Sequence, residues 1–280
     1  MNVRKVKADE FAGKKLADHW DRLHEGDCEP CPTAAHLGAL AKKQSTVRAW
    51  LEQQHGPDAV SERVLEAWRE FHHGDFRAAI AAGETLGAPG ITVANKAAGV
   101  LATYQEANES RALGLLQKAV ARGERVAHEW PDYANAHYML AFVLGRYSQR
   151  ISILQALAEG LATRVRKALV RCLELEPRHG DAHIALGVFH AEVVGKLGSL
   201  AAGLTYNASK AQAIKHLDKA LQLAPHSVIA RVEYAHALSL LDRDSAAQRA
   251  KLLKAAVKLT PVDAMERLDS ERAQRELAAL

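Results

Sequence analysis

Apolar residues recur at three- and four-residue spacing along most of this chain, which is typical of amphipathic helices. The clearest stretch is 167–193, KALVRCLELEPRHGDAHIALGVFHAEV, which predicts the end of one helix, a turn at Pro177 and the start of the next helix. Similar stretches follow at 219–240 and 255–261, and a degenerate version precedes them at 129–147. The chain is therefore predicted to repeat a helical hairpin.

The same periodicity places the other helices. From Ser61 it predicts a helix, a turn at Gly74-Asp75 and a second helix that Gly87, Pro89 and Gly90 end. A further helix is predicted over 93–107, with a long partner over 110–130. The later helices are expected at Asn135–Tyr147, Asp181–Val194, Lys210–Leu223, Val228–Leu241 and Ala246–Leu259.

The two ends of the chain differ from this pattern and predict caps. Near the start, Thr33 is a candidate N-cap for one helix that runs through 37–54 and stops at His55-Gly56-Pro57. We therefore expect an extension of one or two helices over 1–60, with the first ten residues loose, an array of about five hairpins over 61–262, and a capping helix over 263–280.

The repeated stretch resembles the tetratricopeptide repeat (TPR), whose pattern is W-x2-L-G-x2-Y, then A-x3-F, then proline, in about 34 residues. The matching residues are His183-x2-Leu186-Gly187-x2-His190, His137-x2-Leu140-Ala141-x2-Leu144, Arg231-x2-Tyr234-Ala235-x2-Leu238 and Ala213-x3-Leu217 followed by Ala220 and Pro225. The resemblance implies an all-α, right-handed solenoid of helical hairpins. In physical terms, the Gly or Ala permits a close helix crossing, and the proline ends the second helix.

The repeats are longer than the TPR pattern. The turn prolines lie at 131, 177, 225 and 261, so the intervals are 46, 48 and 36 residues. The extra residues form two apolar inserts between the helices of a hairpin, 146–164 and 194–210, which should project from the same edge. The first insert could hold a helical turn or two over Ile151–Glu159.

The enlarged repeats and the helix end Gly145-Arg146-Tyr147 resemble, more narrowly, the regulator of microtubule dynamics family and its bacterial relatives. This resemblance covers about 125–260. For the bacterial members it implies a repeat scaffold and no particular partner.

Composition narrows the function classes. The residues are 48% apolar and 25% charged, and a net charge of +4 from 37 basic and 33 acidic residues gives little support for nucleic-acid binding. The strongest basic cluster, Arg164, Arg166 and Lys167, is expected to be a solvated helix face. No apolar run approaches the ~20 residues of a membrane span, and the start lacks the apolar core of a signal peptide. A cytoplasmic location is therefore expected.

One short motif has the ligand types of a metal site. His24, Cys28, Cys31 and His36 form H-x3-C-x2-C-x4-H, and a tetrahedral zinc site needs four N or S ligands. No second C-x2-C pair is present, and Pro30 and the proline after Cys31 suit an ordinary turn. The motif is therefore kept as a low-ranking metal or redox alternative to a plain loop.

Catalytic signatures are lacking in the sequence. It has no phosphate loop, no Gly-x-Ser-x-Gly elbow and no HExxH motif. His137, His183 and His190 occupy repeat positions that usually hold packing aromatics, so a packing role is favoured over a ligand or base role. We therefore expect a protein that is not an enzyme and has no cofactor.

The concave groove of such an array is the candidate binding site. Nine residues of the first helices are predicted to line it: Asn135, Tyr138, Phe142, Asp181, Ile184, Val188, Ile229, Val232 and His236. TPR proteins that bind chaperone tails use Lys and Asn at such places, whereas this chain has Ile184 with Val188 and Val232 with His236, so no chaperone-tail binding is expected. The alternative is a groove filled by the chain's own termini.

Together these features predict a non-catalytic scaffold that binds a protein or peptide partner through the groove and the inserts 146–164 and 194–210. One alternative is a structural protein that forms a homo-oligomer through the inserts. The other is a metal or redox protein built on Cys28 and Cys31.

Overall fold

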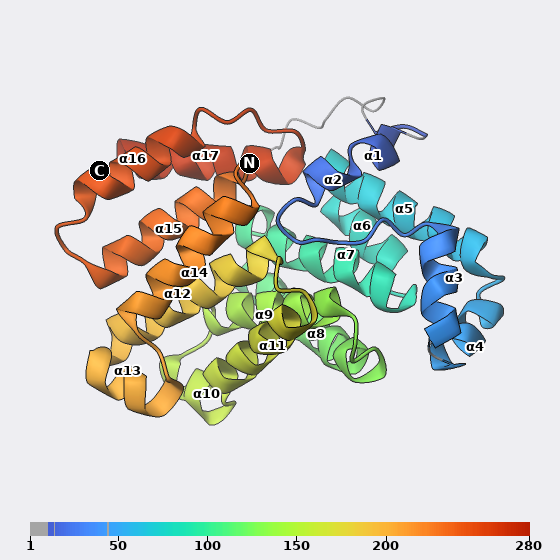
Figure 1. Cartoon of the computed structure of the whole chain (residues 1–280), viewed down its shortest axis with the longest axis horizontal. Helices are drawn as coiled ribbons and strands as arrows, with labels where there is room; N and C mark the ends of the chain where they lie inside the picture. Colours follow the sequence, from blue (N-terminus) through green and yellow to red (C-terminus); the bar gives the residue numbers. More distant parts are fainter. Residues whose placement is uncertain (1–10, 14, 44) are drawn as a thin grey trace. The chain divides into compact units, whose positions relative to one another are not determined.

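The computed structural model describes residues 11–13, 15–43 and 45–280, and the described residues are all-α, with no strand among them. The chain divides into two compact units (Figure 1). Unit 1 contains the residues up to 22 and residues 29–147, and unit 2 contains residues 23–28 and 148–280. The prediction of an all-α fold of helical hairpins is confirmed, whereas the looseness predicted for the first ten residues falls outside the described residues.

Unit 1 is built from hairpins that follow a short N-terminal extension. Its helices are α1 (Lys15–Asp18), α2 (Trp20–Leu23), α3 (Ala34–Lys43), α4 (Ser45–Gln53), α5 (Pro57–His73), α6 (Phe76–Gly83), α7 (Gly87–Val100), the π-helical turn η1 (Leu101–Gln105), α8 (Glu109–Glu129) and α9 (Ala134–Ser148). The α5–α6 turn forms as predicted. Gly74 adopts a φ of 91° at the end of α5, and Asp75 caps α6 by accepting from the Ala78 N–H at 3.1 Å.

Helix α7 is the centre of unit 1 and is buried from Ala88 to Val100. It packs against α5, α6 and α8. The approach to α6 is close, because a Cβ on Gly90 would lie 2.5 Å from the Gly83 carbonyl oxygen and 2.4 Å from Leu86 Cβ. A larger residue at position 90 would therefore push α6 and α7 apart.

Two helix boundaries differ from the prediction. Gly87, Pro89 and Gly90 do not separate two helices; they form the first turn of α7, where proline is tolerated because its missing N–H has no helical partner to bond. The single helix expected over 37–54 is divided into α3 and α4. The predicted cap at Thr33 is present, since its Oγ1 accepts from the His36 N–H at 3.1 Å.

Unit 2 holds the remaining helices and the short segment Leu23–Cys28 from the N-terminal part of the chain. Its helices are α10 (Ile153–Ala158), α11 (Leu161–Leu175), α12 (Gly180–Leu197), α13 (Ser199–Tyr206), α14 (Lys210–Leu223), α15 (Val228–Leu241), α16 (Ala246–Ala256) and α17 (Ala264–Ala278). Helix α12 packs mainly on α14 and α15, and α17 covers α15 and α16.

The small residue of the repeat pattern stands at a close crossing, as predicted. A Cβ on Gly187 of α12 would lie 2.6 Å from Leu217 Cγ and 3.1 Å from the Ala213 carbonyl oxygen of α14. Ala213 and Leu217 are buried with Tyr234 and Leu238 of α15 in one apolar cluster. Glycine is therefore required at position 187 for this packing.

A side chain six residues after each of three turn prolines fixes the turn. His137 Nε2 lies 2.9 Å from the Pro131 carbonyl oxygen, and His183 Nε2 lies 3.1 Å from that of Pro177. In the third repeat, the Arg231 guanidinium donates to the Pro225 carbonyl oxygen at 2.8 Å. These contacts give the carbonyl that precedes each new helix a hydrogen-bond partner.

Both inserts contain a short helix in unit 2. The expected turn within Ile151–Glu159 is α10, and the second insert forms α13, which the sequence analysis did not predict as a helix. Gly198, with a φ of 77°, separates α12 from α13, and Asn207, with a φ of 50°, ends α13. Figure 1 shows α10 and α13 at the same edge of unit 2. Within the described part of the chain, no helix has the length and apolar character needed to span a membrane.

Candidate functional site

The segment Leu23–Cys28 packs on the turns of unit 2. Its Gly26 carbonyl oxygen accepts from the Asp181 N–H at 2.8 Å, at the start of α12. The Glu25 carboxylate accepts from the His226 backbone N–H at 3.2 Å and lies 3.0 Å from His226 Nδ1, just before α15. A Cβ on Gly26 would lie 2.3 Å from Asp181 Oδ1, so a larger residue there would displace the Asp181 carboxylate. The segment therefore occupies the N-terminal ends of two repeat helices.

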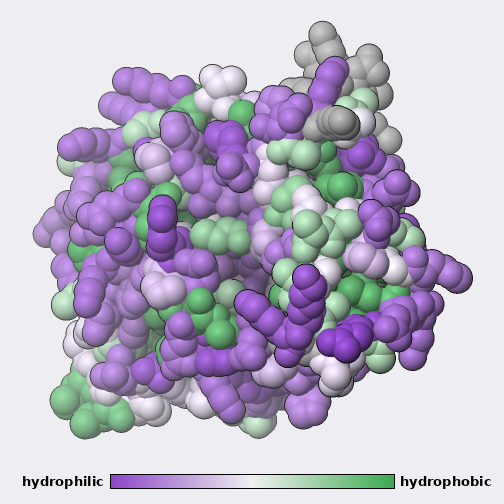
Figure 2. Space-filling model, turned by 45° about the vertical axis from the view of Figure 1, so that its right-hand side comes forward, coloured by the Kyte–Doolittle hydropathy of each residue, from purple (hydrophilic) through white to green (hydrophobic). Residues whose placement is uncertain are grey.

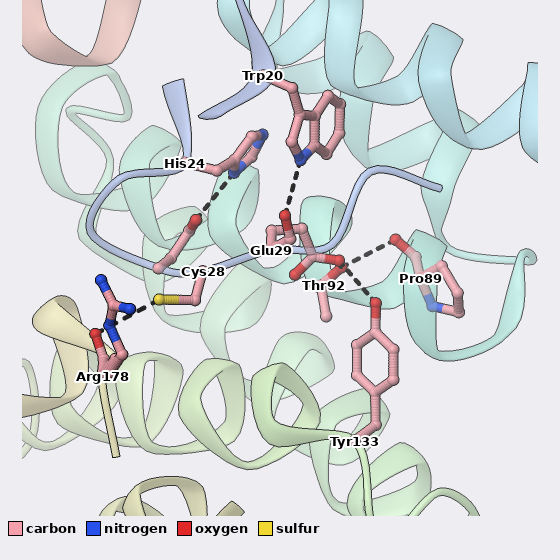
Figure 3. A network of polar contacts seen from close by, with 9 residues as sticks. Trp20, His24, Cys28, Glu29, Pro89, Thr92, Tyr133 and Arg178 are labelled. Atoms are coloured by element: carbon pink, nitrogen blue, oxygen red, sulfur yellow. Dashed lines mark hydrogen bonds and ion pairs between the residues drawn. The ribbon is translucent and has the colours of Figure 1, made fainter. Parts of the chain in front are cut away.

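Two residues of the predicted metal motif, His24 and Cys28, bond to other groups. Figure 3 shows the Cys28 thiol, which donates to the Arg178 carbonyl oxygen at 3.4 Å, and His24 Nδ1, which lies 2.9 Å from Asp27 Oδ1. Burial, followed by the charge of Glu176, raises the pKa of Cys28 to about 12. Burial also raises the pKa of Cys31.

Because the thiolate is the metal ligand and the nucleophile, these shifts oppose both roles. No group of three or more His, Cys, Asp or Glu side chains among the described residues is placed to hold a metal ion. The geometry therefore offers no support for the metal or redox alternative.

Glu29 is the centre of a buried polar network in unit 1 (Figure 3). Its Oε1 lies 2.9 Å from the Tyr133 hydroxyl and 3.1 Å from the Thr92 hydroxyl, which is also 2.8 Å from the Pro89 carbonyl oxygen. Its main-chain carbonyl oxygen accepts from the Trp20 indole N–H at 2.7 Å. These bonds attach the chain after residue 28 to α7, which is a structural role.

Lys96 is a second buried charge in unit 1. Its ammonium nitrogen lies 5.7 Å from the ring centroid of Trp68 and 5.5 Å from that of Phe71, so cation–π attraction stabilises its charge. Nothing in the sequence distinguishes Lys96 or Glu29 from solvent-exposed residues. Their burial follows from the position of α7 in the core of unit 1.

Three histidines are in contact between α12 and α14. Because the Pro177 carbonyl oxygen can only accept, His183 carries its proton on Nε2, and its Nδ1 accepts from His216 Nδ1–H at 2.8 Å. The rings of His190 and His216 stack with centroids 5.8 Å apart. Burial lowers the pKa of His190 and of His216 to about 4, and it also lowers the pKa of His183.

This arrangement agrees with the packing role inferred for His183 and His190. The third member, His216, was missed, because the repeat pattern assigns no special role to its position in the second helix.

The nine residues predicted to line the groove differ in burial. Asn135, Tyr138, Ile184 and Val232 are buried, and Phe142, Asp181, Val188, Ile229 and His236 are half-buried. In unit 2, Ile184 packs with Val188, Ile229 and the alanines of α14 and α15. At Asp181 the segment Leu23–Cys28 contacts the start of α12, and the alternative of a groove filled by the chain's own termini stays a prediction. The role of the nine residues in binding stays a prediction.

The inserts carry six of the eight exposed large hydrophobic side chains of the described residues. We call this set the insert surface; its residues are Ile153, Leu154, Leu157, Leu197, Leu200 and Leu204. They are between 47% and 82% exposed. A hydrophobic patch is visible at the lower left of Figure 2, where Figure 1 places α13. The sequence indicated both inserts through their extra length and apolar content.

Comparison with known proteins gives a family and a fold. The family model described as regulator of microtubule dynamics protein 1-3 matches residues 92–280. A solved structure of a thermophilic TPR protein from Thermus thermophilus superposes with a TM-score of 0.56 at 14% identity, over 77% of this chain and 99% of that chain. At this identity the likeness shows the fold alone. No curated protein matches.

Proposed function

Because the chain belongs to the family of regulator of microtubule dynamics proteins 1-3, we propose that it is a non-catalytic helical repeat scaffold that binds a protein partner through α10 and α13. The observation that carries the proposal is the insert surface of exposed Ile and Leu residues on these two helices and at the end of α12. The TPR-like fold supports it. The family description supports a protein partner over a small molecule, since microtubules are assemblies of protein.

The energetic reason is the exposed apolar area. Covering one Leu or Ile side chain fully contributes roughly 1.5–3 kcal/mol, and exposed apolar clusters tend to mark interaction sites. Only part of this energy becomes affinity, because association also costs motional and side-chain entropy. The half-buried Val188, Ile229 and His236 offer a second contact region if the partner also enters the predicted groove.

The test compares proteins captured by the full chain and by two variants in extract of the native host. The variant Leu200→Ser/Leu204→Ser removes apolar area from α13. Leu280→Ser is the matched control, because Leu280 is a 48% exposed leucine outside the insert surface. We expect a set of captured proteins that the control keeps and the α13 variant loses. If the unchanged chain, the α13 variant and the control all captured the same proteins, the role of the insert surface would be contradicted.

Self-association through the same surface is the second candidate. Light scattering at increasing concentration separates the two functions, because a homo-oligomer would dissociate when Leu200 and Leu204 are replaced. A chain that stays monomeric at high concentration would exclude this candidate and leave the binding of another protein.

A further inference from the structure

The insert surface has the shape of two short apolar stripes. On α13, Leu200 and Leu204 are four residues apart, and on α10 Ile153 and Leu157 have the same spacing, so each pair lies on one helix face. The residues between the leucines of α13 include the exposed small residues Ala201 and Gly203. Such a ridge with small residues beside it suits packing against another helix, because ridges of one helix fit the grooves of another.

The segments of unit 2 that carry the stripes have more basic than acidic residues. Residues 148–167 contain four basic residues and one acidic residue, Glu159, and residues 192–219 contain four lysines and two acidic residues, Glu192 and Asp218. The two segments are therefore net +5, whereas the whole chain is +4, so the rest of the chain is net −1. Lys196 and Lys210 are exposed and pair only at the surface, with Glu192 at 3.0 Å and Asp242 at 3.4 Å.

This charge bears on which partner fits the surface. A second copy of the chain would bring one basic rim against another, which disfavours self-association. A helix with an apolar stripe and acidic flanks would cover the leucines and oppose the lysines and arginines at the same time. Such a partner matches both features of the surface.

We propose that the insert surface binds an amphipathic helix whose apolar stripe is flanked by acidic residues, supplied by another protein. This inference rests on the proposed function and specifies its partner. The apolar stripes supply the contact area, and the basic rim sets the orientation and speeds the encounter. The area of two short helices places the complex in the weak, transient class.

The test uses three fluorescent peptides of about 18 residues, long enough for a helix of ~27 Å. The first has a leucine stripe with glutamate flanks, the second has lysine in place of each glutamate, and the third scrambles the first so that the stripe is lost. Binding to the full chain is measured by fluorescence anisotropy at about 50 and about 200 mM salt. Vesicles with and without anionic phospholipid form a separate arm.

The acidic striped peptide should bind at least about tenfold more tightly than the other two, and more weakly at the higher salt. The variant Leu200→Ser/Leu204→Ser should lose about tenfold in affinity, whereas Leu280→Ser should not. Lys196→Gln/Lys210→Gln should weaken binding and reduce its salt dependence. The matched control Lys251→Gln/Lys254→Gln, on the exposed side of α16, should change neither. Circular dichroism checks that each variant keeps its helix content.

Several results would overturn the inference. These are equal affinity for the acidic and the lysine peptide, binding that survives Leu200→Ser/Leu204→Ser, or binding of anionic vesicles through the insert surface without binding of the peptide. If captured host proteins still depend on Leu200 and Leu204, the proposed function stands while this partner chemistry fails. If neither peptides nor host proteins depend on them, both fail.

Discussion

Helix α7 of unit 1 and helix α13 of unit 2 have similar compositions and opposite environments. Both are rich in alanine and glycine and carry few charges. Yet α7 is buried from Ala88 to Val100, whereas Ala202 is the only buried residue within α13. Helix α7 has neighbours on several sides, whereas α13 packs mainly on α12. Apolar content therefore does not decide burial; the number of helices that surround a segment does.

The largest difference in stability between the two helices is expected when the same substitution, glycine to alanine, is made in each. In Gly90→Ala the new methyl meets the Gly83 carbonyl oxygen and Leu86, so unit 1 should lose about 3 kcal/mol of unfolding free energy. In Gly203→Ala, which has no atom closer than 4.0 Å, stability should stay equal or rise by up to about 1 kcal/mol. Urea unfolding measures both. Equal effects would mean that α7 is no more tightly enclosed than α13.

The probe can be specific for one unit. Trp20, Trp50, Trp68 and Trp130, the four tryptophans of the chain, all belong to unit 1. Tryptophan fluorescence therefore follows unit 1, while circular dichroism follows both units.

A smaller effect is expected when side chains are shortened. Val93→Ala in α7 removes two methyl groups from a fully buried site and should cost roughly 2 kcal/mol. Leu204→Ala in α13 shortens an 82% exposed side chain and should change stability by less than about 0.5 kcal/mol. A cost for Leu204→Ala as large as that for Val93→Ala would show that α13 is covered by another part of the chain in solution.

The smallest expected effect concerns the packed helices next to α13. The pKa of His190 and of His216 is about 4 in the folded chain, below the usual value near 6.5. Their contribution to stability is therefore complete above pH ~6.5 and is lost as the pH falls toward ~4, because the unfolded chain takes up the protons first. Burial is the main cause of both low pKa values. The charge of Arg166 on α11 lowers the pKa of His190 further, and the charges of His183, His190 and Lys215 lower the pKa of His216 further.

The substitutions His190→Phe and His216→Gln should make unit 2 less sensitive to acid. The measurement is the circular dichroism midpoint in acid, with the tryptophan signal of unit 1 as the internal reference. If neither substitution lowered the midpoint pH, the contact between α12 and α14 would not be the acid-sensitive element.

Local signals predicted much of the fold. Gly74-Asp75 and Pro177 mark turns through backbone geometry that depends on a few neighbouring residues, and the crossing at Gly187 follows from a repeated spacing. The predicted start of α7 was wrong because proline and glycine occur both after the end of one helix and in the first turn of the next, so their presence alone does not tell the two cases apart. Periodicity carries no information about Glu29, whose partners Thr92 and Tyr133 are distant in sequence.

The proposed binding surface could be predicted only in part, because its location depends on local sequence signals but its exposure depends on long-range packing. The extra length between Pro131, Pro177 and Pro225 located both inserts without any knowledge of contacts. The sequence did not reveal that Leu200 and Leu204 are exposed, because exposure depends on which helices pack against α13. The histidine contacts were likewise out of reach, since His183 and His216 lie on different helices.

The segment Leu23–Cys28 has a consequence for how the chain is made. Glu25 and His226 are 201 residues apart in the sequence, and Cys28 and Arg178 are 150 residues apart. At about 5–20 residues per second of synthesis, the segment leaves the ribosome roughly 10–40 seconds before the helix ends it contacts. The segment must therefore remain without these contacts until the rest of unit 2 has been synthesised. A gene fragment that encodes 148–280 alone would omit this part of unit 2.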